Sequence, residues 1–178
     1  MPTIGVSLAV PEPWGSHLQE FRVANGDAQG AAIPTHITLV PPIVVAPEQM
    51  PEVERHLTSV AAASAPYEVH LRGSGTFQPI SPVVFVNLVE GISQTERLAQ
   101  DCRSGPLTLD LDFPYHPHVT VAHLEDEALL DRAFGDLAGF ECAFGVSAFH
   151  LYVHDQDRGW QPSREYALTG DGNVTPPG

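Results

Sequence analysis

Apolar and polar residues alternate in several short stretches of the chain, and this pattern predicts β-strands. In THITLVPP (residues 35–42) polar and apolar side chains alternate until the pair Pro41 and Pro42, which predicts the end of that strand. Similar stretches, rich in β-branched residues or alternating in polarity, predict strands at residues 3–10, 67–77, 81–90, 118–124, 140–153 and 164–170.

Helical patterns separate these strands, at residues 11–26, 47–64, 94–102 and 125–139. In the second of them Met50, Val53, Leu57 and Val60 are spaced three or four residues apart, which is typical of an amphipathic helix. The chain therefore mixes strands and helices along its whole length, which indicates an α+β protein.

The order of the elements starts over at the strand 81–90. Each half reads strand, helix, a strand with the pattern His-any-Thr, helix, strand, and the two halves lie about 80 residues apart. Such a repeat predicts two lobes related by an approximate two-fold axis. We expect one bilobal domain over residues 1–170 and a flexible tail at 171–178.

Composition narrows the choice of partners. The chain has 178 residues, a formal net charge of −14, and 8 basic residues that are all arginine. Its field should repel polyanions, so long nucleic acid is disfavoured as a partner, whereas a small phosphate compound can still bind at a local site. Cys102 and Cys142 are expected to be reduced, and no leader or membrane span is recognised, so we expect a cytoplasmic monomer that does not bind membranes.

The pattern His-any-Thr occurs three times, and its setting separates the copies. On a strand, residues two apart share a face, so His36 lies beside Thr38 and His118 beside Thr120. The third copy, at His56, falls in a predicted helix, where residues two apart point in different directions. We interpret His56 as a surface residue.

Two such strands related by a two-fold axis would bring both His-Thr pairs into one cleft. One neutral imidazole could then accept a proton while the opposite imidazolium donates one, since the ordinary pKa of histidine near 6.5 permits both roles. The threonine hydroxyls could donate hydrogen bonds to an oxyanion between them. The alternative is that these histidines only satisfy hydrogen bonds in the protein core.

The two motifs, IPTHITLVPP and YHPHVTV, resemble the paired His-x-Thr motifs of the 2H phosphoesterase superfamily, which includes 2'-5' RNA ligase-like proteins and cyclic nucleotide phosphodiesterases. The resemblance covers the chain to about Gly170. It implies a bilobal α+β fold with antiparallel sheets around a central cleft and no metal or other cofactor. It also implies that His36 and His118 are the acid and base and that Thr38 and Thr120 bind the phosphate.

The activity that the resemblance implies is metal-independent hydrolysis of a 2',3'-cyclic phosphate, on a nucleotide or a short RNA end. Which histidine is the base stays open. Alternatives are a 2'-5' RNA ligase, which performs the same transfer to a 5'-hydroxyl, and a nucleotide-binding module without turnover. RNA-acting relatives often have a basic residue soon after the second motif, where this chain has Ala122 and His123, so a small substrate is favoured over long RNA.

Other residues are candidates for substrate contacts. His116 and His123 flank the second motif, although His123 has the wrong strand parity unless a bulge intervenes. Arg22 could reach a phosphate, and Tyr115 is the first choice to stack on a base. Further aromatic candidates are Phe77, Phe113, Tyr152 and Trp160. A metal site is disfavoured because the histidines lack a carboxylate or cysteine at ligand spacing.

Overall fold

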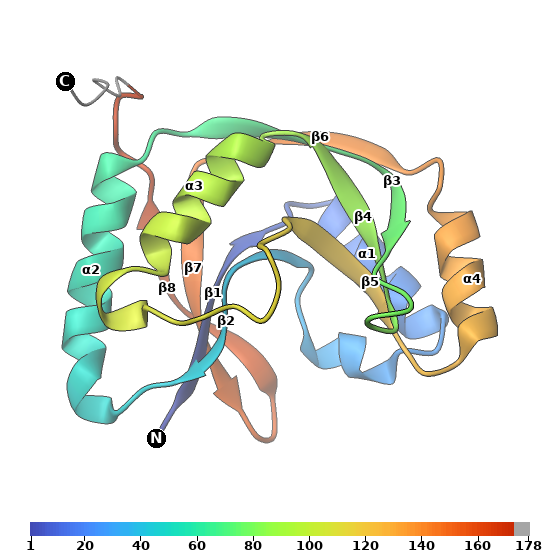
Figure 1. Cartoon of the computed structure of the whole chain (residues 1–178), viewed down its shortest axis with the longest axis horizontal. Coiled ribbons are helices and arrows are strands. Elements are labelled where there is room, and N and C mark those ends of the chain that lie inside the picture. The colour runs from blue at the N-terminus through green and yellow to red at the C-terminus, as the bar shows by residue number, and fades with distance from the viewer. Residues whose placement is uncertain (173–178) are drawn as a thin grey trace.

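The computed structural model describes residues 1–172 and contains two antiparallel four-stranded sheets (Figure 1). The first sheet has the order β2 (His36–Val44), β1 (Thr3–Ala9), β7 (Ala148–Asp155), β8 (Gly159–Ala167). The second has the order β5 (His118–His123), β4 (Val83–Glu90), β3 (Tyr67–Thr76), β6 (Glu141–Val146). The predicted α+β class with antiparallel sheets is confirmed. Of the predicted tail, residues 173–178 lie outside the described residues.

Four α-helices and three short 3-10 helices connect the strands in the described part of the chain. They are α1 (Trp14–Ala24), η1 (Ala28–Ala32), η2 (Pro47–Gln49), α2 (Met50–Ala63), α3 (Ile92–Cys102), η3 (Gly105–Leu107) and α4 (Glu127–Asp136). The apolar stripe of α2 is buried as predicted, with Val53 and Leu57 fully covered. Burial of each such side chain stabilises the fold by about 1.5–3 kcal/mol.

The two halves of the sequence exchange elements. Strand β3 is the last strand of the first half but pairs with β4, whereas β7 belongs to the second half and pairs with β1. Helix α1 likewise packs against β5, and α3 packs against β2 beside α2, as Figure 1 shows. Each lobe therefore contains parts of both halves. The order of elements could not reveal this exchange, because it does not state which strands pair.

The stretch 140–153, predicted as one strand, is two strands in different sheets. Strand β6 pairs with β3, and after Ser147 the chain continues as β7, which pairs with β1. Burial alternates within each strand, but the buried positions change from even-numbered residues in β6 to odd-numbered ones at the start of β7, and this shift at Ser147 and Ala148 marks the change of partner. The last strand, predicted at 164–170, is also displaced, because β8 covers Gly159–Ala167.

The prolines at 41 and 42 do not end β2, contrary to the prediction. The strand continues to Val44, and between the pairs Ile4↔Ile43 and Val6↔Val40 its register shifts by one residue. Strand β2 is the edge of its sheet. An edge strand tolerates proline because one side of its backbone has no partner to which an N–H must donate.

Candidate active site

The two His-Thr strands, β2 and β5, are edge strands of different sheets and contact each other. Their apolar residues are fully buried: Ile37, Leu39, Val119 and Val121 are each 0% exposed. The histidines and threonines between them, which lie on the opposite face, are half-buried. The strands are therefore anchored from behind and present both motifs toward the space between the sheets.

Each motif strand has a β-bulge directly after its threonine. In β2 the pairs Ser7↔Thr38 and Val6↔Val40 leave Leu39 as an extra residue, and in β5 the pairs Phe85↔Thr120 and Val84↔Ala122 leave Val121 as an extra residue. The second bulge changes the parity of the strand, so that His123 lies on the same side as Thr120. The sequence predicted His123 at the cleft only if a bulge changed the parity of the strand, and this bulge is present.

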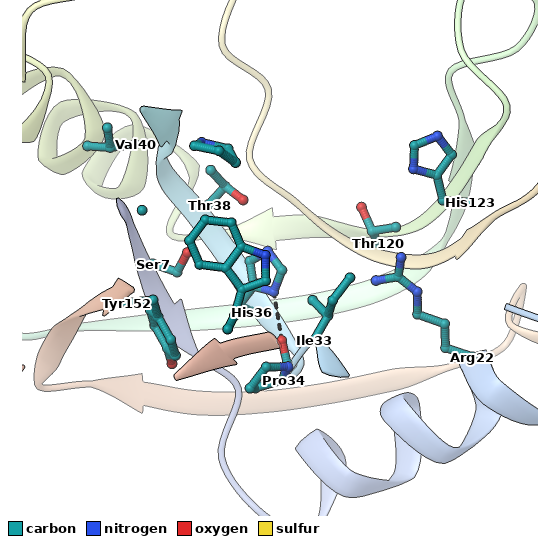
Figure 2. Close-up of a pocket in the computed structure, with 13 residues that line it drawn as sticks. Ser7, Arg22, Ile33, Pro34, His36, Thr38, Val40, Thr120, His123 and Tyr152 are labelled. Atoms are coloured by element: carbon teal, nitrogen blue, oxygen red, sulfur yellow. Dashed lines mark hydrogen bonds between the residues drawn. The ribbon is translucent and has the colours of Figure 1, made fainter. Parts of the chain in front are cut away.

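A cavity of about 210 Å³ lies between the motif strands. His36, Thr38 and Thr120 line it, and Figure 2 shows the two threonines entering it from different strands. The complete lining is Gly5, Ser7, Arg22, Ile33, Pro34, His36, Thr38, Val40, Pro42, Thr120, His123, Tyr152 and Trp160. His118 is not part of that lining but shares the face of Thr120 and lies near enough to His36 for their charges to interact.

Both histidines are held in the same way. The Nδ1 atom of His36 is 2.7 Å from the carbonyl oxygen of Pro34, and that of His118 is 2.6 Å from the carbonyl oxygen of His116. A carbonyl oxygen can only accept, so Nδ1 carries the hydrogen in both rings. The second nitrogen, Nε2, therefore has a free lone pair when the ring is neutral, and can accept a proton.

Burial lowers the pKa of both histidines. For His118 the pKa falls to about 4, because burial outweighs the hydrogen bond to His116, and the charges of His116 and His36 lower it further. For His36 burial again lowers the pKa against the hydrogen bond to Pro34, and the positive charge of Arg22 adds to the effect. Both imidazoles are therefore neutral in the free protein near neutral pH.

Arg22 extends from α1 toward Thr120, as Figure 2 shows, and is the cation of the cavity. Its Nε donates to Oδ2 of Asp27 at 2.6 Å, and the same oxygen accepts the backbone N–H of His123 at 3.0 Å. One buried carboxylate thus connects the helix of the first half to the motif strand of the second. The sequence indicated Arg22 but not Asp27, because the approach of β5 to α1 was not predicted.

The two sides of the site differ in how they are filled. Next to Thr38 lies the small residue Ser7, whereas the equivalent neighbour of Thr120 is Phe85. Phe85 packs on Phe77 with ring centroids 4.4 Å apart, and Phe77 meets the ring of His118 edge-on at 4.9 Å. The His118 side is therefore filled with aromatic rings, while the His36 side is hollow.

The remaining candidates from the sequence are placed unequally. Tyr115 does not line the cavity: its hydroxyl donates to the carbonyl oxygen of Thr38 at 2.7 Å, and Arg103 covers its ring. His116 lies outside the lining and holds His118 through its carbonyl. Among the aromatic candidates, Tyr152 and Trp160 line the cavity. Ser7 was missed, although its pairing with Thr38 would have revealed it.

Comparison with known proteins agrees with this arrangement. The model of the 2'-5' RNA ligase superfamily matches residues 10–158, which include both motif strands and Arg22. The chain belongs to this superfamily, the 2H phosphoesterases. A relative from Bacillus cytotoxicus, named "Putative phosphoesterase", is 26% identical over 82% of this chain and 88% of its own. A Bacillus thuringiensis relative of the same name is 27% identical over 84% of this chain and 90% of its own.

Solved structures with a similar fold match nearly the whole chain. The protein TT0787 of Thermus thermophilus superimposes with a TM-score of 0.70 at 21% identity, covering 95% of this chain and 99% of its own. Escherichia coli LigT in complex with NADP+ superimposes with a TM-score of 0.63 at 22% identity, with the same coverage of 95% and 99%. At these identities the likeness concerns the fold.

The described residues offer neither a cluster of metal ligands nor a membrane-spanning helix. Within residues 1–172, no three His, Cys, Asp or Glu side chains are grouped so that they could hold a metal ion. No helix in this range is long and apolar enough to cross a membrane.

Proposed function

We propose that this 2H phosphoesterase is a metal-independent phosphodiesterase that hydrolyses a 2',3'-cyclic phosphate on a nucleotide or short RNA end. The observation that carries the proposal is the pair of opposed His-Thr strands in which each histidine has a free Nε2. Such a pair can move one proton to and one proton from a phosphorus centre that lies between the strands.

Thr38, Thr120 and Arg22 would bind the phosphate. The two hydroxyls donate to its non-bridging oxygens, and the guanidinium supplies charge-assisted hydrogen bonds where negative charge builds up in the transition state. Binding of this anion also favours protonation of the nearby imidazoles, which offsets the lowering of their pKa by burial.

In this proposal, we infer the two proton-transfer roles from the unequal filling of the site. The nucleoside would occupy the hollow side, where Trp160 and Tyr152 offer aromatic surfaces to a base. The leaving ribose oxygen then lies at His36, which is the acid. The attacking water would enter from the side of His118, where the rings of Phe77 and Phe85 pack against the imidazole and do not line the cavity, and His118 is the base.

Hydrolysis then proceeds in line. Nε2 of His118 accepts a proton from water as the water oxygen bonds to phosphorus, and the bond from phosphorus to the ribose oxygen breaks on the opposite side. Nε2 of His36 donates its proton to that oxygen. The product is a nucleoside monoester, and exchange with solvent then returns a proton to His36 and removes one from His118.

Known ligands of a related structure support a small substrate. LigT of Escherichia coli has been crystallised with 3'-AMP, with ATP and with phosphate, and it shares the fold of this chain. The strong negative charge of this chain also favours a small nucleotide over long RNA.

The proposal is tested by incubating the protein with 2',3'-cyclic nucleoside monophosphates in the presence of EDTA and following the product by phosphorus NMR. We expect turnover that survives chelation and is lost in the His118→Ala variant. The chemical shift of the product reports whether the phosphate stays on O2' or O3'. Tight binding of cyclic nucleotide without any product would instead indicate a binding module.

RNA ligation is the second candidate, because the matching family model is named for it. The same site would join the phosphorus to a 5'-hydroxyl in place of water, with His118 accepting the hydroxyl proton. RNA halves that carry a 2',3'-cyclic end and a 5'-hydroxyl end distinguish the two reactions. A joined product that forms faster than the hydrolysed end would favour the ligase.

A further inference from the structure

Asp27 lies directly behind Arg22 at the edge of the cavity. The side chains of this ion pair are 9% and 3% exposed, and Nε of Arg22 is 2.6 Å from Oδ2 of Asp27. The backbone N–H of Asp27 also donates to the carbonyl oxygen of Arg22. The carboxylate is thus fixed close to the group that would bind the phosphate.

The stem of Arg22 is confined by the neighbouring turn η1. A Cβ atom at Gly30 would lie 2.8 Å from Cγ and Cδ of Arg22, so the backbone of this turn rests against the side chain. With Nε held by Asp27, the terminal nitrogens of the guanidinium are directed toward Thr120, as Figure 2 shows. Arg22 therefore cannot move toward a ligand without leaving its carboxylate.

The ion pair between Arg22 and Asp27 determines the net charge near a ligand in the cavity. Apart from histidine and the neutral phenol of Tyr152, Arg22 is the ionisable side chain among the described residues that line the cavity. Burial keeps His36 neutral, since it lowers the pKa of that ring. The positive charge of Arg22 is therefore balanced by Asp27, and Glu125 adds negative charge in the adjoining hollow that Asp27 and His123 line.

The proposed substrate and product differ in charge. A cyclic phosphodiester carries one negative charge, whereas the ring-opened monoester approaches two near neutral pH because its second pKa is about 6. A balanced ion pair still offers the directed N–H groups of Arg22 to the first charge. The ion pair offers little net attraction to the second negative charge of the monoester, because Asp27 repels that charge.

We propose that Asp27 is a specificity-determining residue, whose carboxylate makes the cavity select phosphodiester monoanions and release phosphomonoester dianions. The inference rests on the proposed function, in which the product is a monoester. It assigns to this buried carboxylate a role in product release in addition to its structural contacts with Arg22 and His123.

The test is a calorimetric comparison of two ligands, 2',3'-cyclic AMP and 3'-AMP, at pH 8, where the monoester is a dianion. It uses the His118→Ala protein, so that the diester is not consumed, with and without Asp27→Asn. The amide keeps an oxygen that can accept the N–H of His123 but removes the charge. We expect the ratio of the two affinities to move toward 3'-AMP by about tenfold.

The matched control is Asp136→Asn in the same background. Asp136 pairs with Arg132 at 3.7 Å on the exposed surface of α4, so this variant makes the same change of net charge at a residue outside the cavity lining. We expect its ratio of affinities to equal that of the parent protein. An unchanged ratio in Asp27→Asn would overturn the proposal and leave Asp27 a purely structural role.

A second measurement needs no substitution at Asp27. In the His118→Ala protein, the affinity for 3'-AMP relative to 2',3'-cyclic AMP should rise when the pH is lowered from 8 to 5.5, because only the monoester loses a charge. A constant ratio would contradict the proposal. If the ratio shifts as expected but the unsubstituted protein does not hydrolyse 2',3'-cyclic AMP, the proposed reaction alone is contradicted. Failure of the His118→Ala protein to bind either ligand would contradict both proposals.

Discussion

The two halves of the site contain the same motif on the same kind of strand, but their surroundings differ. His36 and His118 are both fixed by a carbonyl two residues earlier, and both strands bulge directly after the threonine. Beside Thr38 the neighbouring strand has Ser7, whereas beside Thr120 it has Phe85. The repeat thus preserves the geometry that the proposed catalysis requires, and in this proposal the neighbours of each motif determine which side admits substrate.

The largest expected effect comes from removing either histidine. His36→Ala and His118→Ala should each lower kcat for 2',3'-cyclic AMP by about 10²–10⁴-fold, because each removes one proton transfer. Steady-state kinetics measure this, and circular dichroism checks the fold. The control is His56→Ala, since His56 is on helix α2 and its ring nitrogen contacts the carbonyl of Cys102. A comparable loss in that variant would refute the assignment.

Removal of the cation should come next. Arg22→Gln should raise KM for a cyclic nucleotide by about 10–100-fold, as expected for the loss of charge-assisted hydrogen bonds. It also leaves Asp27 buried without its partner, so the double variant Arg22→Gln/Asp27→Asn separates lost binding from lost stability. If the double variant binds substrate as tightly as the parent, Arg22 does not bind the phosphate.

Base stacking tests whether the nucleoside binds on the hollow side of the site. Trp160→Ala should raise KM for 2',3'-cyclic AMP by about tenfold, in the range found for base stacking on an aromatic ring. The matched control is Phe113→Ala, because Phe113 is 65% exposed and is not part of the cavity lining. Equal KM values in the two variants would place the nucleoside elsewhere.

The pH dependence of kcat/KM tests the roles of both histidines and the effect of the aromatic rings around His118. The base must be neutral, so kcat/KM should fall as the pH drops through the His118 pKa of about 4. The acid must be protonated, so kcat/KM should also fall as the pH rises through the lowered pKa of His36. The optimum therefore lies below pH 6.5. Phe77→Ala should shift the low-pH limb to higher pH, because exposure to water raises the pKa of His118. An unshifted limb would show that Phe77 does not lower the pKa of His118.

The smallest effect is expected for Tyr115, which lies behind the cavity. Tyr115→Phe removes the hydrogen bond to the carbonyl of Thr38 and should lower the free energy of unfolding by about 0.5–1.5 kcal/mol. Because Tyr115 does not line the cavity, KM should change little. Urea unfolding and steady-state kinetics measure the two quantities. A large rise in KM without loss of stability would restore Tyr115 as a substrate contact.

Much of the site could be predicted because it depends on local rules. Alternation along a strand placed His36 and Thr38 on one face, and the element repeat indicated an equivalent partner for them. What could not be predicted depends on contacts between distant segments. Asp27 reaches β5 only because α1 of the first half packs against β5 of the second, and Tyr115 is turned away by its hydrogen bond to the carbonyl oxygen of Thr38.

The strand errors have the same origin. A pair of prolines ends a strand that needs every N–H, but β2 is an edge strand and continues through Pro41 and Pro42. The split at Ser147 follows from a change of pairing partner between the two sheets, and along the chain it is marked only by a shift in the phase of the alternation. Local patterns specified the elements, and tertiary pairing specified their ends.

The most direct test of the proposal that His36 is the acid and His118 the base is to compare substrates that differ in their leaving group. Bis-p-nitrophenyl phosphate releases a stable phenolate that needs no proton, whereas the ribose oxygen of 2',3'-cyclic AMP does. We predict that His36→Ala, which lacks the acid, regains most of its lost rate on the nitrophenyl ester, while His118→Ala remains defective on both substrates. Recovery in His118→Ala and not in His36→Ala would contradict the account.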